Sequence, residues 1–308
     1  MNNLVVKAVN CLLLVFGTFL LSAQTPHVSS GSIQHFEKFP SQYVTARNVD
    51  VWLPEGYTPR RKYAVLYMHD GQMLFDSAMT WNHQEWGVDE TVSKLLKEKK
   101  IRRCIVVAIW NNNATRHSDY FPQKAFELLP KQAQDTLLQH KPDGKTALFS
   151  AGIQSDNYLR FLVSELKPFI DSHFSTKKDR KNTFIAGSSM GGLISLYAIC
   201  EYPKVFGGAA CLSTHWPGIF TLNNNPIPEG FIRYMEAHLP APKTHKIYFD
   251  YGTETLDALY EPFQKQADQV MIRKKYTAGR WISLKYEHAD HSEKAWARRL
   301  HIPLEFLL

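Results

Sequence analysis

The sequence predicts an α/β sandwich, in which a mainly parallel sheet is covered by helices on both faces. Short, almost continuous apolar runs rich in β-branched residues recur along the chain, which is typical of strands buried on both faces. Amphipathic patterns of helical period lie between or after these runs. Residues 33–54 alternate more strictly between apolar and polar, and this pattern suits antiparallel strands at one edge of the sheet.

The chain has 308 residues, of which 44% are hydrophobic, so it can bury a large core. Residues 1–24 combine a lysine at position 7, an apolar run and the small-residue sequence Ser22-Ala23-Gln24. This order is typical of a secretory signal peptide, and the apolar run is shorter than the roughly 20 residues that span a bilayer. We therefore expect export to the periplasm or the extracellular space, without stable membrane insertion after cleavage. No repeat or long linker divides residues 25–308, which are expected to form a single domain.

Later apolar runs are expected to form strands at residues 63–68, 105–109, 183–186, 208–212, 247–250 and 281–286. Helices are expected at residues 90–97, 158–170, 193–201, 260–274 and 292–307. Residues 111–152 show no readable period, and we expect them to form a lid or an insertion over the site. Because binding sites in such sheets lie at the carboxyl ends of the strands, functional residues are expected just after the apolar runs.

The sequence Gly187-Ser188-Ser189-Met190-Gly191 lies between an expected strand and an expected helix. The pattern Gly-x-Ser-x-Gly alone arises by chance in about one chain in ten of this length, and it can also be a simple packing turn. In a strand–turn–helix context, however, the small residues allow a sharp, strained turn that presents the central Ser189 above the sheet. The helix that follows offers unpaired N–H groups to an oxyanion. This context indicates a serine nucleophile.

A serine nucleophile needs a histidine base that is oriented by an acid, and in this strand–turn–helix arrangement both follow the serine in the chain. After the run 247–250, the loop carries two carboxylates, Glu254 and Asp257. After the run 281–286, the chain carries two histidines, His288 and His291. The residues alone therefore supply two candidates for each role.

An oxyanion hole also needs an N–H group from the loop after an early strand. The sequence His69-Asp70-Gly71-Gln72 is in this position, and Gly71 permits a tight turn that can direct the N–H of Gln72 at a reacting carbonyl. His69 and Asp70 are expected to brace the turn.

Taken together, His69-Asp70-Gly71-Gln72, Leu74-Phe75-Asp76, the segment 187–192 and the ending from His291 to Trp296 resemble the putative esterase (esterase D-like) family of α/β-hydrolases. The resemblance runs from about residue 40 to the C-terminus. That family includes feruloyl and acetyl esterases of plant polysaccharides and esterases of ferric siderophores.

The resemblance implies that Ser189 is the nucleophile and that the N–H groups of Met190 and Gln72 bind the oxyanion. The family's histidine precedes a Trp-bearing C-terminal helix, which favours His291 over His288. Relatives often carry an Asp close behind Gly-Thr at the strand end, where this chain has Glu254 and Thr255. Counting back from the helix 260–274 favours Asp257 as the acid, with Glu254 as the alternative.

The distribution of charged residues and of possible metal ligands argues against nucleic-acid-binding and metal-binding classes of protein. The net charge of +7 comes from scattered short groups of basic residues, so a nucleic-acid partner is not expected. His288, Asp290 and His291 lack a companion cluster of metal-ligand spacing, so neither a metal nor another cofactor is expected. Cys104, Cys200 and Cys211 lie in apolar surroundings and are expected to be buried thiols, with a Cys200–Cys211 disulfide as the alternative.

We therefore expect an exported serine carboxylic-ester hydrolase that removes feruloyl or acetyl-type groups from glycans or related small esters. Loop groups at 81–83, 111–113 and 214–216, with Tyr120, either form an acyl or sugar pocket or simply pack the loops. The alternatives for function are a ferric-siderophore esterase, an acyltransferase on the same scaffold, and a binding protein with an inactive site.

Overall fold

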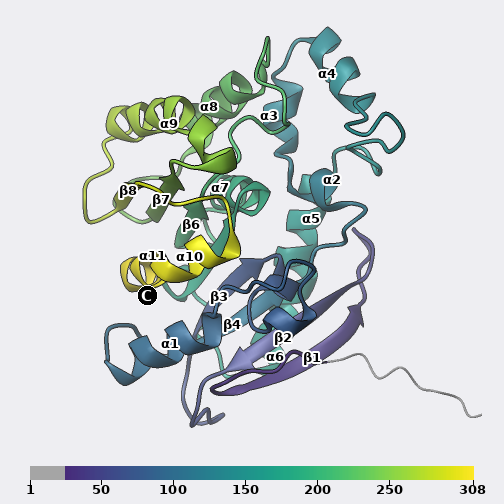
Figure 1. Cartoon of the computed structure of the whole chain (residues 1–308). Helices are drawn as coiled ribbons and strands as arrows, with labels where there is room; N and C mark the ends of the chain where they lie inside the picture. Colours follow the sequence, from purple (N-terminus) through teal and green to yellow (C-terminus); the bar gives the residue numbers. More distant parts are fainter. Residues whose placement is uncertain (1–24) are drawn as a thin grey trace, which may run out of the picture.

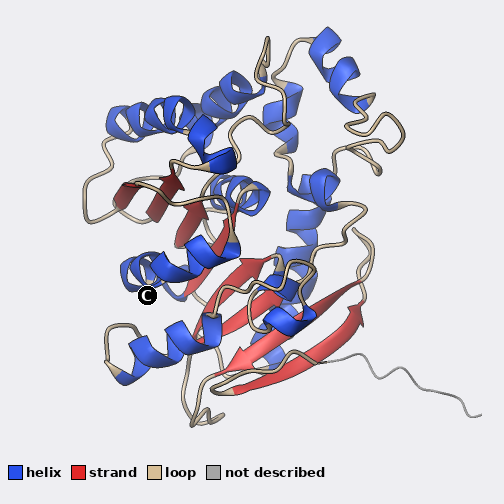
Figure 2. Cartoon of the chain, in the orientation of Figure 1, coloured by secondary structure: helices blue, strands red, loops and turns tan. Residues whose placement is uncertain are grey.

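The structure is a computed structural model that describes residues 25–308; the predicted signal peptide, residues 1–24, lies outside the described residues. Its centre is an eight-stranded sheet of order β1-β2-β4-β3-β5-β6-β7-β8 (Figure 2). The strands are β1 (Ser32–Phe39), β2 (Arg47–Leu53), β3 (Ala64–His69), β4 (Cys104–Ile109), β5 (Thr183–Ser188), β6 (Gly208–Leu212), β7 (Lys246–Gly252) and β8 (Trp281–Tyr286). β1 pairs with β2 and β2 with β4 in antiparallel fashion, and the other neighbours are parallel. The predicted mainly parallel sheet with antiparallel N-terminal strands is thus confirmed.

Helices cover both faces of this sheet (Figure 1). The α-helices are α1 (Val88–Lys97), α2 (Arg116–Tyr120), α3 (Gln123–Glu127), α4 (Lys131–Leu138), α5 (Ser155–Arg160), α6 (Lys167–His173), α7 (Met190–Glu201), α8 (Ile227–His238), α9 (Glu261–Arg273), α10 (Glu293–Arg299) and α11 (His301–Leu307). Side chains of α1, α10 and α11 belong to the hydrophobic core on one face, and those of α5 to α9 to the core on the other. On the first of these faces, the C-terminal helix α11 packs beside α1.

The central strands read as continuous apolar runs because each of their faces is buried. In β3, Val65 and Tyr67 pack into one core, whereas Leu66 and Met68 pack into the other. All six residues of β3 are buried, as are all six of β4. Burial on both sides removes the polar alternation that marks a half-exposed strand.

Two helices differ from the expected pattern for local reasons. The expected helix 292–307 is divided into α10 and α11 around Leu300. Pro303 in the first turn of α11 has no N–H to donate to the carbonyl of Arg299, so the helix cannot continue unbroken. α8 was not predicted, because Pro226, Pro228 and Gly230 resemble a loop; proline in a first helical turn is nevertheless compatible with a helix start.

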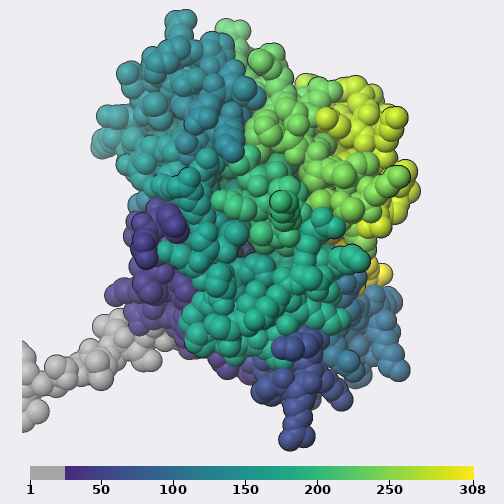
Figure 3. Space-filling model, turned by 180° about the vertical axis from the view of Figure 1, so that it is seen from behind, coloured from purple at the N-terminus to yellow at the C-terminus, as the bar shows by residue number. Residues whose placement is uncertain are grey.

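In place of the expected helix 158–170, the structure has a longer helical stretch from Ser155 to His173. It consists of α5, the π-helical segment Phe161–Leu166 and α6, which follow one another without a break. The region 111–152, which was expected to form a lid or an insertion, contains α2, α3 and α4. α2 packs on α5 and α7, and α3 packs on α8. Seen from behind, this region forms an upper corner of the molecule beside α8 (Figure 3).

Cys104, Cys200 and Cys211 are buried free thiols, so the alternative of a Cys200–Cys211 disulfide is wrong. Burial raises the pKa of Cys104 to about 12, and the apolar surroundings make all three cysteines small hydrophobic core residues. Within residues 25–308, none of the helices is both long and apolar enough to cross a membrane.

Candidate active site

Ser189 occupies the sharp turn between β5 and α7 at the carboxyl end of the sheet. Its φ of 57° and ψ of −122° lie in a region that residues with a side chain rarely adopt. The turn is held because the Ser189 N–H donates to the Leu212 carbonyl at 2.9 Å and the Gly192 N–H donates to the Ser189 carbonyl at 3.0 Å. A Cβ at Gly187 would lie 2.9 Å from the backbone of Gly191, so this turn requires glycine there. Backbone packing therefore compensates for the strain at Ser189.

The structure brings His291 and Asp257 together and leaves the competing residues outside. His291 Nδ1 lies 2.5 Å from Asp257 Oδ1, and the Asp257 side chain is fully buried. Glu254 points elsewhere, with its carboxylate 3.7 Å from Nδ1 of the exposed His288. The backbone N–H of His291 donates to Thr255 Oγ1 at 2.9 Å, which ties the histidine loop to the acid loop.

The imidazole of His291 is held between aromatic rings. It makes edge contacts with Trp296, at a centroid distance of 4.9 Å, and with Tyr260, at 5.8 Å. Its side chain remains 14% exposed, and it lines the same cleft as Ser189. With Nδ1 facing Asp257, Nε2 is the nitrogen that can accept a proton.

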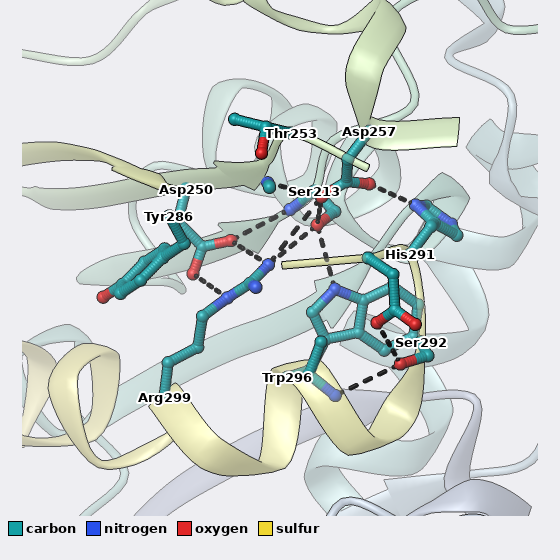
Figure 4. Close-up of polar contacts among 12 residues, drawn as sticks. Ser213, Asp250, Thr253, Asp257, Tyr286, His291, Ser292, Trp296 and Arg299 are labelled. Atoms are coloured by element: carbon teal, nitrogen blue, oxygen red, sulfur yellow. Dashed lines mark hydrogen bonds and ion pairs between the residues drawn. The ribbon is translucent and has the colours of Figure 1, made fainter. Parts of the chain in front are cut away.

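Behind Asp257 lies a buried polar network (Figure 4). The carboxylate of Asp257 accepts hydrogen bonds from the Ser213 hydroxyl at 2.5 Å and the Gly252 N–H at 2.6 Å. Ser213 is in turn contacted by Arg299, which also binds Asp250 through two hydrogen bonds of 3.0 and 3.1 Å. Burial raises the pKa of Asp250 even though the Arg299 guanidinium opposes the shift. Of the residues in this network, only Asp257 was predicted as a site residue.

The loop after β3 carries Gln72, whose N–H is the second expected oxyanion donor. Gly71, Gln72 and Met73 form a short 3₁₀ helix, so the Gln72 N–H, like that of Met190, lies in a first helical turn, where N–H groups lack partners within the helix. A Cβ at Gly71 would lie 2.6 Å from the backbone of Ala108 in β4. This close approach explains why the loop requires glycine.

Asp70 directly precedes this 3₁₀ helix, and its backbone is left-handed, with a φ of 56°. Arg116 binds the Asp70 carboxylate through two hydrogen bonds of 2.8 and 2.7 Å, and Asn111 adds a third at 2.7 Å. Burial opposes ionisation of Asp70, but the Arg116 guanidinium holds its pKa below the ordinary value. His69 Nδ1 lies 2.8 Å from the Tyr158 hydroxyl, and burial lowers the pKa of His69 to about 3. His69 is therefore a neutral core residue at physiological pH.

Ser189 and His291 open into a cleft of about 540 Å³. Its lining includes the carboxamide side chains of Gln72, Asn82, Gln84, Asn111 and Asn113. Its charged side chains are Asp70, Glu293 and Arg116. Its aromatic side chains are Trp81, Trp86 and Trp296, and Trp81 is 84% exposed at the rim. Amides, indoles and few charges suit a neutral polar ligand.

The loop groups expected at the pocket divide into two sets. Trp81, Asn111 and Asn113 line the cleft, whereas Tyr120 and Trp216 are fully buried in the core. His215 is also buried, and its Nδ1 lies 2.8 Å from the hydroxyl of Tyr260. Sequence reasoning missed Arg116, which comes from a helix with no recognisable motif, and gave no role to Glu293, which lies within the ending from His291 to Trp296. A larger hollow of about 740 Å³ lies beyond the histidine loop, but neither Ser189 nor His291 lines it.

The sheet order, the strained serine turn and the position of the histidine loop define an α/β-hydrolase fold. The profile of the family described as "Putative esterase" matches residues 42–306. The chain therefore belongs to the putative esterase family.

Curated relatives match parts of the chain. An uncharacterised protein of Bacillus subtilis, YjcH, is 26% identical over 178 residues, which make up 58% of this chain and 60% of the length of YjcH. The endo-1,4-β-xylanase/feruloyl esterase of Xylanibacter ruminicola is 24% identical over 202 residues, which make up 60% of this chain but 22% of the relative. The chain thus spans less than two thirds of the length of these relatives.

Solved structures share the fold over most of the chain. A ferulic acid esterase from Anaeromyces mucronatus has a TM-score of 0.61 at 20% identity, and the match covers 92% of this chain and 92% of that protein. The ferric enterobactin esterase of Salmonella typhimurium has a TM-score of 0.59 at 17% identity, over 92% of this chain and 59% of the other.

Proposed function

We propose that this protein is a carboxylic ester hydrolase whose nucleophile is Ser189, whose base is His291 and whose acid is Asp257. One observation carries the proposal: the strained Ser189 turn opens into the same cleft as His291, and Nδ1 of His291 lies 2.5 Å from Asp257. This is the order of groups that activates a serine hydroxyl.

In this mechanism, Ser189 Oγ attacks the ester carbonyl while His291 Nε2 takes its proton. The N–H groups of Met190 and Gln72 hold the developing oxyanion. His291 then returns the proton to the departing alcohol, leaving an acyl-serine. Water, deprotonated by His291, attacks this ester in the same way, and the carboxylic acid leaves as Ser189 recovers its proton. The chemistry requires no cofactor.

We propose that the substrates are acylated glycans or their fragments, with feruloyl or acetyl-type acyl groups. The cleft offers amide groups that can bind sugar hydroxyls and an exposed indole at Trp81 that can lie against a ring. The names of the Xylanibacter and Anaeromyces proteins support the same class of substrate. The leader pattern of residues 1–24 supports action outside the cytoplasm.

A ferric-siderophore esterase is the second candidate, because the fold is shared with a ferric enterobactin esterase. The cleft charge favours the glycan instead. Asp70 and Glu293 contribute two carboxylates against the one guanidinium of Arg116, so the lining does not complement a polyanionic ferric catecholate. An acyltransferase would use the same groups and differ only in admitting a hydroxyl acceptor in place of water.

Fluorophosphonate labelling of the mature protein, followed by peptide mapping, tests the nucleophile. We expect a single adduct on Ser189, none in Ser189→Ala, and an unchanged adduct in Ser188→Ala, the matched control one residue away. No adduct on folded protein would contradict the mechanism and favour a binding role. Turnover of acetylated and feruloylated sugars, compared with a ferric catecholate triester, then identifies the substrate, and a transfer product with added sugar would indicate an acyltransferase.

A further inference from the structure

Resting on the function proposed above, we propose that Ser213 is a positioning residue for the reaction: its hydroxyl orients the carboxylate of Asp257 and connects it to the cation of Arg299. A hydroxyl has one proton and two lone pairs, so its neighbours decide which group it donates to.

Ser213 lies just after β6, at the carboxyl end of the sheet, and is fully buried. Its φ of 41° is in the left-handed region, which a serine adopts only under constraint. Its backbone N–H donates to the carbonyl of Asp250 at 2.8 Å and approaches Asp250 Oδ1 at 3.2 Å. These contacts hold the hydroxyl between β7 and helix α10 (Figure 4).

The direction of the Ser213 hydroxyl follows from its neighbours. Trp296 Nε1 and Arg299 Nη2 each lie 2.9 Å from Ser213 Oγ. Both groups are donors only, so they occupy the two lone pairs of the oxygen. The single hydroxyl proton must then be donated to the remaining neighbour, Asp257 Oδ2, at 2.5 Å.

This arrangement divides the two oxygens of Asp257. Oδ2 accepts from Ser213 and from the Gly252 N–H, whereas Oδ1 faces His291 Nδ1. Rotation of the carboxylate would break several buried hydrogen bonds at once, so the oxygen that faces His291 is fixed.

Arg299 supplies the positive charge behind this carboxylate. Its Nη2 lies 3.9 Å from Asp257 Oδ2, beyond a direct hydrogen bond, and 2.9 Å from Ser213 Oγ. A hydroxyl that accepts from a cation becomes a stronger donor, because hydrogen bonds in a chain polarise one another. Arg299 is also held by its two hydrogen bonds to Asp250, so removal of the Ser213 hydroxyl leaves that ion pair in place.

The test is Ser213→Gly. Glycine adopts a φ of 41° without strain, so the variant removes the hydroxyl while the backbone can keep its conformation. Ser213→Ala, which retains the Cβ, is the second variant and supplies the same readouts if the glycine variant is unstable. Ser195→Ala is the matched control, since Ser195 is an equally buried serine whose hydroxyl donates to the Gly191 carbonyl and does not contact Asp257.

We expect kcat/KM for a soluble ester to fall about 10- to 100-fold in the Ser213 variants, as for loss of one hydrogen bond to a charged group, with the loss in kcat rather than in KM. A proton NMR spectrum of the enzyme without substrate should show the His291 Nδ1–H resonance shifted or broadened. The pH at which kcat/KM reaches half its maximum should also change. Ser195→Ala should leave all three readouts unaltered.

A folded Ser213→Gly enzyme with normal kcat/KM, an unchanged pH profile and an unchanged resonance would overturn the proposal. Loss of activity with an unchanged resonance and pH profile would also overturn it, because the serine would then act only through general packing. The NMR readout requires no turnover, so the two proposals can fail separately. Wild-type protein without esterase activity, but with a Ser213-dependent resonance, would contradict the function and leave the positioning role intact.

Discussion

The strain at Ser189 predicts that Ser189→Gly is more stable than Ser189→Ala, which reverses the order expected at an ordinary helical position. Ser189 adopts a φ of 57° and a ψ of −122°, a conformation that costs a residue with a side chain about 1–3 kcal/mol and that glycine adopts freely. Glycine also loses about 0.4–1 kcal/mol more conformational entropy on folding than alanine. With the midpoints of these two ranges, about 2 and about 0.7 kcal/mol, Ser189→Gly is expected to be more stable than Ser189→Ala by about 1.3 kcal/mol.

At about 2–4 °C per kcal/mol for a large domain, that difference corresponds to a rise of about 3–5 °C in the melting temperature. Calorimetry and urea denaturation of the two variants measure it, and both variants should lack esterase activity. Ser195 in the interior of α7 supplies the control, because glycine there should be less stable than alanine by about 1 kcal/mol. If Ser189→Ala proves as stable as Ser189→Gly, the turn stores no such strain and the reasoning is wrong.

Four further predictions follow from the same geometry. Asp257→Asn should lower kcat about 10⁴-fold, because an amide no longer selects the Nδ1–H tautomer of His291, and a steady-state assay that shows a loss below tenfold would contradict the assigned acid. His69 has a pKa of about 3 when folded and about 6.5 when unfolded, so its stabilising contribution is present above pH 6.5 and is lost as the pH falls towards 3. Urea denaturation should show this loss, with a slope of up to about 1.4 kcal/mol per pH unit, and His69→Gln should flatten the curve. A maleimide should leave the buried thiols of the folded protein unmodified and label all of them after unfolding without reductant; incomplete labelling would indicate a disulfide. Trp81→Ala should raise KM for a glycan ester about 2- to 10-fold and leave the melting temperature unchanged, since the indole is 84% exposed; an equal effect on a short alkyl ester would argue against a sugar contact.

Local features of the sequence were sufficient to predict the sheet and the sharp turn at Ser189. Each expected apolar run forms a strand, and β6 and β8 have the expected bounds. The serine turn depends on the small residues next to Ser189, because a Cβ at Gly187 would clash within the same turn. Strand formation and tight turns depend mainly on neighbours in the sequence, so they leave a pattern that can be read there.

The partners of that serine are a different matter, because long-range contacts decide them. Glu254 and Asp257 differ by three positions in one loop, as do His288 and His291 in another, and only the packing of these loops against each other places Asp257 beside His291. Ser213, Arg299 and Asp250 carry no motif at all, since a buried hydrogen bond between distant segments imposes no periodicity on the chain. The sequence by itself therefore determined the scaffold and the sharp turn at Ser189. The tertiary structure decided which acid and histidine meet and what orients them, because those contacts join residues that only the folded chain brings together.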